Sequence, residues 1–184
     1  MVGAVIVKEG KIIGEGYHKK AGGPHAEIEA LKEAGFNAKG ATIYVNLEPF
    51  CHYGKTPPCT EALIKAQIAR VVAAIEDPNS KVAGKGFSQL QNAGIEVSVG
   101  VLKDKASKLN EVFIKNISEQ IPFVAAKIAQ SIDGKIALSS GKSKWITCDA
   151  ARKRGHEIRS IYDGILVGIG TVLADDPILD CRLA

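Results

Sequence analysis

The order of the expected secondary-structure elements constrains the fold of this chain more than any other feature of the sequence. Residues 2–7 and 11–17 read as two strands joined across Glu9-Gly10, which predicts a β-hairpin. After residue 24 the pattern changes to an alternation of helices and strands. Helices are expected at 25–34, 60–67 and 87–93, and strands at 42–47, 70–75 and 95–99. A hairpin followed by this alternation implies an α/β fold with three layers, helix–sheet–helix, around a mixed sheet.

One imidazole, one carboxylate and two thiols stand close to the starts of two of these helices. His25 and Glu27 lie in the first turn that follows Gly22-Gly23-Pro24, and Cys51 and Cys59 lie in the loop after the strand 42–47. A catalytic zinc site uses three protein ligands and keeps a fourth position for water. Free backbone N–H groups at a helix start favour thiolate over thiol. The pattern predicts that His25, Cys51 and Cys59 bind Zn²⁺ and that Glu27 carries protons, as in zinc deaminases.

A structural role for the same residues is the alternative. A histidine at a helix start can be part of a cap, and two cysteines eight positions apart can be small apolar core residues. The H-x-E spacing is weak evidence when it stands alone. Its weight comes from the combination with L-E-P at the strand end and with both thiols.

The motifs along the chain resemble those of the bifunctional riboflavin-biosynthesis deaminase/reductase family. They are V-G-A-V-I-V, H-A-E, L-E-P, H-Y-G-K-T-P-P-C, S-I-D-G-K-I-A and G-T-V-L-A-D-D-P, and they extend over essentially the whole sequence. The resemblance implies a zinc-dependent deaminase domain of the cytidine deaminase-like fold at 1–119. It implies the first part of a dihydrofolate-reductase-like domain at 122–184. The wide spacing of the thiols differs from the close C-x-x-C pair of nucleic-acid and cytidine deaminases.

The resemblance also implies two reactions. The first is the hydrolytic deamination of 2,5-diamino-6-(5-phosphoribosylamino)pyrimidin-4-one to 5-amino-6-(5-phosphoribosylamino)uracil. The second is the NADPH-dependent reduction of the ribosyl group. Residues expected to bind substrate are His52 and Lys55 in the first domain, and Ser143, Arg159, Leu179 and Arg182 in the second. Residues expected to bind NADPH are Ala129, Trp145, Thr171 and Asp175.

The chain departs from the family pattern at the metal loop and at both ends. Phe50 stands where the family has its first loop cysteine, and Cys51 follows one residue later. Adjacent side chains point in different directions, so zinc binding by Cys51 requires the loop to shift its register. The helix and the P-N-P turn that precede the first strand in the family are missing before Met1, and the reductase half is incomplete at residue 184. We therefore expect no reductase activity, and an inactive remnant of the riboflavin enzyme or another nucleobase or nucleic-acid deaminase stays open as an alternative.

The second half is expected to begin at Pro122, after a connecting helix at 103–119. Apolar runs predict strands at 123–129 and 163–168, and an amphipathic pattern predicts a helix at 149–160.

Composition narrows the class of partner. The net charge is +4 and the lysines are scattered, which argues against a nucleic-acid partner. No apolar run approaches the roughly 20 residues of a membrane span. Two of the four cysteines lie in the site loop, which favours metal chemistry in a reducing compartment, the cytoplasm. The expected partner is a small pyrimidine ribosyl phosphate, and association into a homo-oligomer is left open.

Overall fold

The computed structural model describes residues 1–80 and 82–183. The chain divides into two compact units, the first ending at Phe123 and the second starting at Val124. The domain boundary expected at Pro122 lies beside this division.

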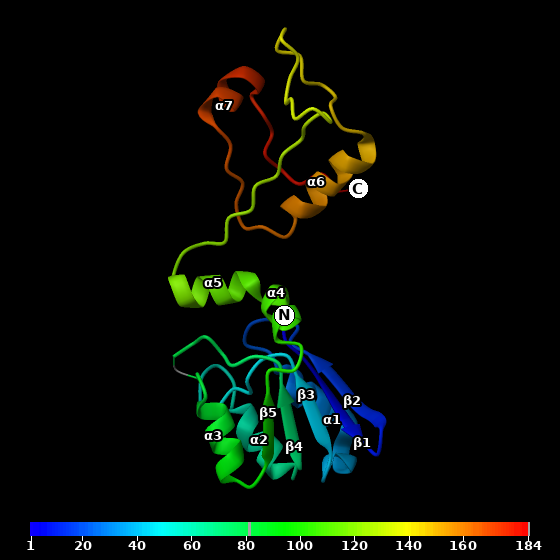
Figure 1. The fold of residues 1–184 in the computed structure, drawn as a ribbon, viewed down its shortest axis with the longest axis vertical. Helices are drawn as coiled ribbons and strands as arrows, with labels where there is room; N and C mark the ends of the chain where they lie inside the picture. Colours follow the sequence, from blue (N-terminus) through cyan, green and yellow to red (C-terminus); the bar gives the residue numbers. More distant parts are fainter. Residues whose placement is uncertain (81, 184) are drawn as a thin grey trace. The chain divides into compact units, whose positions relative to one another are not determined.

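The first unit is built on a five-stranded mixed sheet, as expected (Figure 1). Strand β1 is antiparallel to both of its neighbours, β2 and β3, whereas β3, β4 and β5 are parallel to one another. The spatial order is β2-β1-β3-β4-β5. The strands are β1 (Gly3–Lys8), β2 (Lys11–Tyr17), β3 (Thr42–Val45), β4 (Arg70–Ala73) and β5 (Glu96–Val99).

Three helices pack against the sheet through one apolar core. They are α1 (Ala26–Ala34), α2 (Cys59–Lys65) and α3 (Lys85–Asn92), and a short 3₁₀ turn, η1 (Gly35–Ala38), follows α1. Fully buried side chains of this core are Ile6, Ile43, Val71, Leu63 and Leu90. The expected α/β class and the expected element order are confirmed.

The connecting helix expected at 103–119 is broken at Asn110 into α4 (Lys103–Leu109) and α5 (Glu111–Glu119). Asparagine has a low helix propensity, and the Oδ1 atom of Asn110 accepts a hydrogen bond from the amino group of Met1 at 2.6 Å. Ala106 of α4 and Phe113 of α5 pack with Leu47, Ala74 and Ile75 in a second apolar cluster. Because these last three residues follow β3 and β4, the second cluster lies beyond the carboxyl ends of those strands.

Helix α1 rests directly on the backbone of β2, because two glycines of that strand carry no side chain. A Cβ atom at Gly14 would lie 2.3 Å from the carbonyl oxygen of Ala30, and one at Gly16 would lie 2.2 Å from that of Ala26. Either distance is far below van der Waals contact. The glycines thus fix the depth at which α1 packs on the sheet.

The second unit contains α6 (Asp149–Arg159) and α7 (Ile169–Asp175). Helix α6 confirms the amphipathic pattern, whereas α7 was not predicted. The strands expected at 123–129 and 163–168 are wrong: both segments are irregular. A strand needs a hydrogen-bonded neighbour, and the described part of this unit supplies none.

The described helices include none with the length and apolar character needed to cross a membrane.

Candidate metal centre

The first turns of α1 and α2 carry the side chains at the centre of the candidate site. His25 precedes α1 in an extended conformation, and Glu27 is the second residue of that helix. Cys59 is the first residue of α2, directly after Pro57-Pro58. Glycine and proline force the chain to turn at both places, so each helix begins at the site.

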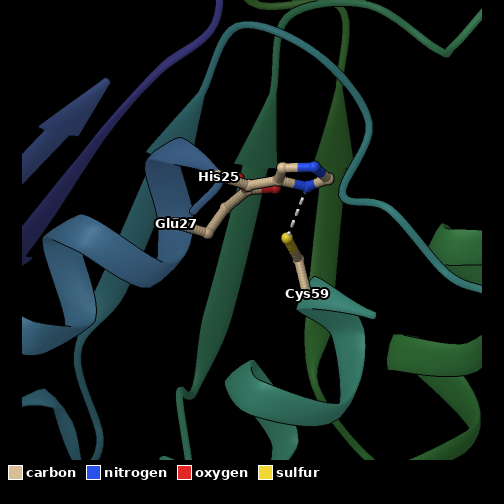
Figure 2. Close-up of side chains that lie close together, drawn as sticks. All are labelled: His25, Glu27 and Cys59. Atoms are coloured by element: carbon tan, nitrogen blue, oxygen red, sulfur yellow. Dashed lines mark hydrogen bonds between the residues drawn. The ribbon is translucent and has the colours of Figure 1, made fainter. Parts of the chain in front are cut away.

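These three side chains converge (Figure 2). The Nδ1 atom of His25 lies 3.2 Å from the Sγ atom of Cys59. One potential ligand atom from each of His25, Glu27 and Cys59 lies within 4.8 Å of the other two. On the other side of the imidazole ring, the Oγ1 atom of Thr56 lies 3.1 Å from Nε2.

Burial sets the electrostatics of the cluster. It raises the pKa of the Glu27 carboxyl group. It also raises the pKa of the Cys59 thiol, and the neighbouring Glu27 carboxylate raises it further. The pKa of His25 is lowered by burial and then by the charge of His18. In each case the desolvated charged form is disfavoured, which a bound divalent cation would reverse for the two anions. The half-buried imidazole of His25 and the buried thiol and carboxylate are donor types that zinc binds, so the residues present fit this metal.

The structure does not bring Cys51 into this cluster. Its backbone carbonyl accepts a hydrogen bond from Nε2 of Gln89 at 3.0 Å. The pKa of the buried Cys51 thiol is raised by burial and then by the carboxylate of Glu48. For the Cys59 thiol, the carboxylate that raises the pKa after burial is that of Glu27. The group of ligand atoms that lie within 4.8 Å of one another includes Cys59 and, among the described residues, does not include Cys51. Zinc binding by Cys51 stays a prediction that requires the loop to move.

The ring of Phe50 lies beside the imidazole of His25. The two ring centroids are 5.2 Å apart with an edge-on geometry, and the ring of Phe50 is 4.1 Å from that of His52 on another side. An aromatic hydrocarbon therefore occupies space next to the candidate metal ligand.

Sequence reasoning missed the structural role of Glu48. Its buried carboxylate accepts hydrogen bonds from four backbone N–H groups, those of Asp77, Gly84, Gly86 and Phe87, at 2.9–3.4 Å. This carboxylate ties the end of β3 to the start of α3. The sequence did offer one indication of this role. A glutamate that stands between apolar residues after a buried strand is expected to be buried itself, and a buried carboxylate needs hydrogen-bond partners.

The two predicted substrate residues of the loop lie in different environments. His52 is half-buried, and among the described atoms its buried Nδ1 has no hydrogen-bond partner. Lys55 is exposed. A pocket of about 440 Å³ opens beside His25, and its lining includes Gly22, Ile28, Thr56, Pro58 and Lys65.

The remaining predicted residues lie in the second unit. Arg159 donates a hydrogen bond to the backbone carbonyl of Asp180 at 3.0 Å, and Arg182 pairs with the carboxylate of the same residue. The two arginines predicted to bind a phosphate group therefore meet at Asp180, while Ser143 and Leu179 lie on irregular segments.

The residues predicted to bind NADPH are spread along this unit. Trp145 packs under the guanidinium group of Arg152 at 4.3 Å, and Ala129 lies on an irregular segment. Thr171 and Asp175 lie on α7.

Comparisons with known proteins follow the same two parts. The sequence model of the cytidine and deoxycytidylate deaminase zinc-binding region matches residues 1–75, and that of the RibD C-terminal domain matches residues 122–184. The riboflavin biosynthesis protein RibD of Aquifex aeolicus is 55% identical over 98% of this chain and 51% of its own length. The protein of the same name from Escherichia coli is 52% identical over 98% of this chain and 49% of its own length.

Two solved structures are similar over nearly the whole chain. Acinetobacter baumannii RibD, form 1, has a TM-score of 0.90 and 55% identity, covering 99% of this chain and 51% of its own. The diaminohydroxyphosphoribosylaminopyrimidine deaminase/5-amino-6-(5-phosphoribosylamino)uracil reductase of Thermotoga maritima has a TM-score of 0.88 and 51% identity, covering 99% of this chain and 52% of its own.

The chain spans about half the length of the curated relatives it matches. Its identity to them extends through both units. On this evidence the chain belongs to the RibD family of riboflavin biosynthesis proteins.

Proposed function

We propose that the first unit catalyses the hydrolytic deamination of 2,5-diamino-6-(5-phosphoribosylamino)pyrimidin-4-one to 5-amino-6-(5-phosphoribosylamino)uracil. The observation that carries this proposal is the convergence of His25, Glu27 and Cys59 at the starts of α1 and α2. The name of the Thermotoga maritima relative supports the choice of substrate. The match of residues 1–75 to a deaminase zinc-binding region supports the metal.

The side chains divide the work by their chemistry. His25 and Cys59 would hold Zn²⁺, which when bound makes a water molecule acidic enough to attack at neutral pH. The Glu27 carboxylate lies beside both and is placed to take a proton and to deliver it to the departing amino nitrogen. Its burial keeps bulk water from competing for that proton.

Substrate binding is assigned to the neighbouring loop and pocket. The Lys55 ammonium is exposed and free to reach a phosphate group. His52 is also assigned to the pyrimidine, and its buried Nδ1 would have to turn outward to meet a polar group of the ring. The pocket of about 440 Å³ beside His25 is large enough for the ring to approach the metal ligands.

For the second unit we propose descent from the family's NADPH-dependent reductase, on the basis of the match of residues 122–184, with no reductase turnover in this chain. Ala129, Trp145, Thr171 and Asp175 are the proposed cofactor contacts. The proposed contacts of the sugar phosphate are Ser143, Arg159, Leu179 and Arg182.

The proposed setting follows from the same chemistry. All four cysteines are free, as expected in a reducing compartment such as the cytoplasm. The partner is a small molecule, and neither a nucleic acid nor a membrane is part of the proposal.

The direct test is ammonia release from the diaminopyrimidinone ribosyl phosphate by zinc-loaded protein, with cytidine and single-stranded DNA as comparison substrates. Ammonia is expected to be released from the diaminopyrimidinone ribosyl phosphate and not from the two comparison substrates. Release from cytidine or DNA instead would point to another deaminase.

A second reading is favoured by one observation. Because the Phe50 ring lies 5.2 Å from the ring of His25, the chain is alternatively a remnant that has lost the reaction. Zinc-loaded protein that releases no ammonia from any of these substrates would support that reading.

A further inference from the structure

We infer that Glu27 is the third protein ligand of the metal in this chain, together with His25 and Cys59. The inference rests on the proposed function and deepens it by naming the ligand set. It gives the Glu27 carboxylate two successive roles, as a ligand before substrate arrives and as the proton carrier afterwards.

The first support is the geometry of the three side chains. With metal–ligand distances of about 2.0–2.3 Å, the ligand atoms of a tetrahedral zinc site lie roughly 3.3–3.7 Å apart. The 3.2 Å between Nδ1 of His25 and Sγ of Cys59 is already close to that separation. A carboxylate oxygen of Glu27 lies within 4.8 Å of a ring nitrogen of His25 and of Sγ of Cys59, so a small movement of the Glu27 side chain would complete the set (Figure 2).

The second support is the orientation of the imidazole ring. Thr56 Oγ1 lies 3.1 Å from Nε2 of His25 and can accept a hydrogen bond from it. Such a bond holds the proton on Nε2 and leaves the lone pair of Nδ1 directed at the cluster. The ring atom that faces Cys59 is therefore the one available to the metal.

The third support is the position of the loop that would otherwise supply the third ligand. The Phe50 carbonyl accepts a hydrogen bond from the Thr60 N–H of α2 at 3.2 Å, and the Cys51 carbonyl accepts one from Gln89 of α3 at 3.0 Å. Gln89 also accepts a hydrogen bond from the Thr60 hydroxyl at 2.7 Å, which locks the two helices to the loop. Turning Cys51 into the cluster would break this network, whereas Glu27 is already in place.

The consequence for catalysis is a conflict of roles. A carboxylate bound to the metal would be a weaker base than a free one, so Glu27 would have to loosen from the metal to carry protons efficiently. Turnover in this chain would then be slower than with a thiolate at position 50, which would leave Glu27 free.

The test is metal affinity, measured for zinc by competition with a chromophoric chelator. Glu27→Gln is expected to weaken zinc binding by about tenfold or more, because it removes a ligand. Cys51→Ser and Glu29→Gln are expected to leave it unchanged within about twofold. Glu29 is the matched control, since it lies on the same helix and pairs with Lys32. Full zinc affinity in Glu27→Gln, or its loss in Cys51→Ser, would overturn the inference.

A second measurement keeps the test decisive if Glu27→Gln folds poorly. Cobalt in the unaltered chain should show the sulfur charge-transfer band of one thiolate, which Cys59→Ser abolishes and Cys51→Ser leaves intact. The double variant Phe50→Cys, Glu27→Gln should regain zinc affinity, and its cobalt-loaded form should show the charge-transfer band of two thiolates. A two-thiolate band in the unaltered chain would contradict the assignment.

Ammonia release by Phe50→Cys separates this inference from the proposed function. If Glu27→Gln loses zinc but Phe50→Cys releases no ammonia, the ligand set stands and the proposed function fails. If Glu27→Gln keeps zinc while Phe50→Cys deaminates the substrate, the function stands and the ligand set fails.

Discussion

His25 and Cys59 stand 34 positions apart in the chain, yet the imidazole Nδ1 of one lies 3.2 Å from the sulfur of the other. Each residue is at the start of its helix, and the two helices pack against the same apolar core. The short distance between the two side chains is therefore set by the packing of both helices on the sheet, and not by the loop between the residues. Changes in that loop should alter the metal's third ligand without separating these two.

Replacing Phe50 by cysteine should raise both zinc affinity and deaminase turnover. The new thiolate would lie next to His25, where the ring now lies, and would leave Glu27 free to carry protons. Phe50→Ala is the control, because it removes the ring without adding a ligand. Equal gains in the two variants would show that relief of crowding, and not ligation, is responsible. Zinc titration and ammonia release provide the measurements.

Replacing Gly16 by alanine should destabilise the first unit by about 1–3 kcal/mol. The added Cβ would lie 2.2 Å from the Ala26 carbonyl, so α1 must move away from β2 and carry His25 with it. Zinc affinity should fall along with the free energy of unfolding in urea. Gly3→Ala is the control, since its Cβ would meet only a carbonyl at 3.7 Å. An unchanged zinc affinity in a destabilised Gly16→Ala would mean that α1 does not set the position of His25.

Replacing Glu48 by glutamine should cost about 2 kcal/mol or more of unfolding free energy, because a hydrogen bond to a charged acceptor contributes about 1.5–3 kcal/mol. The amide NH₂ group would face backbone N–H groups that now donate to a carboxylate oxygen. Glu76→Gln provides a comparison at an exposed carboxylate nearby. A difference of less than about 0.5 kcal/mol between the two variants would show that the network is not a source of stability.

Asp77 should make the protein less stable as the pH rises through the titration of its carboxyl group. Burial is the main cause that raises the pKa of Asp77 in the folded state. The hydrogen bond from the Asn79 N–H lowers this pKa, and the nearby Glu48 carboxylate raises it again. Between the unfolded value of about 3.9 and this raised value, the folded state binds more protons, so stability falls with increasing pH. His52 acts in the opposite direction and weakens the effect.

The Asp77 effect can be isolated as a difference between variants. Asp77→Asn keeps an acceptor for the Asn79 N–H and should be more stable than the unaltered chain at pH 7. The difference should vanish below about pH 4, where both forms are neutral. The exposed Asp104→Asn serves as the control in urea unfolding at each pH. A stability difference independent of pH would rule out titration of Asp77 as its source.

The second unit should not oxidise NADPH in this chain. The segments 123–129 and 163–168 lack a strand partner in the described structure, and the predicted cofactor residues lie on separate segments. NADPH oxidation with the ribosylaminouracil phosphate gives the rate, and limited proteolysis shows whether residues after Phe123 form a resistant unit. Measurable turnover would contradict this prediction.

The local sequence pattern was sufficient to predict the helices and strands of the first unit, because each of them is bounded by a turn and shows one clear periodicity. The strands at 42–45 and 70–73 were therefore found, with ends differing by two residues from expectation. The same reasoning failed at 123–129 and 163–168. An apolar run indicates that a segment is to be buried, but a strand also needs a neighbour that the run itself does not reveal.

The candidate site was predictable only in part. The helix starts at His25 and Cys59 follow from glycine and proline, and a shared core brings such starts together. The direction of the Cys51 side chain depends on hydrogen bonds from Thr60 and Gln89, which lie on two other elements. Loop torsions set by distant partners leave no local pattern, and the same is true of the four donors around Glu48.

The contact of α1 with Gly14 and Gly16 joins metal binding to the outermost strand of the sheet. Edge strands normally fray more readily than central ones, because half of their backbone groups face water. Here the edge cannot separate without removing the support beneath His25 and Glu27. A metal ion held by those residues would therefore protect the amide hydrogens of β2 against exchange, although none of the proposed ligand atoms lies on that strand.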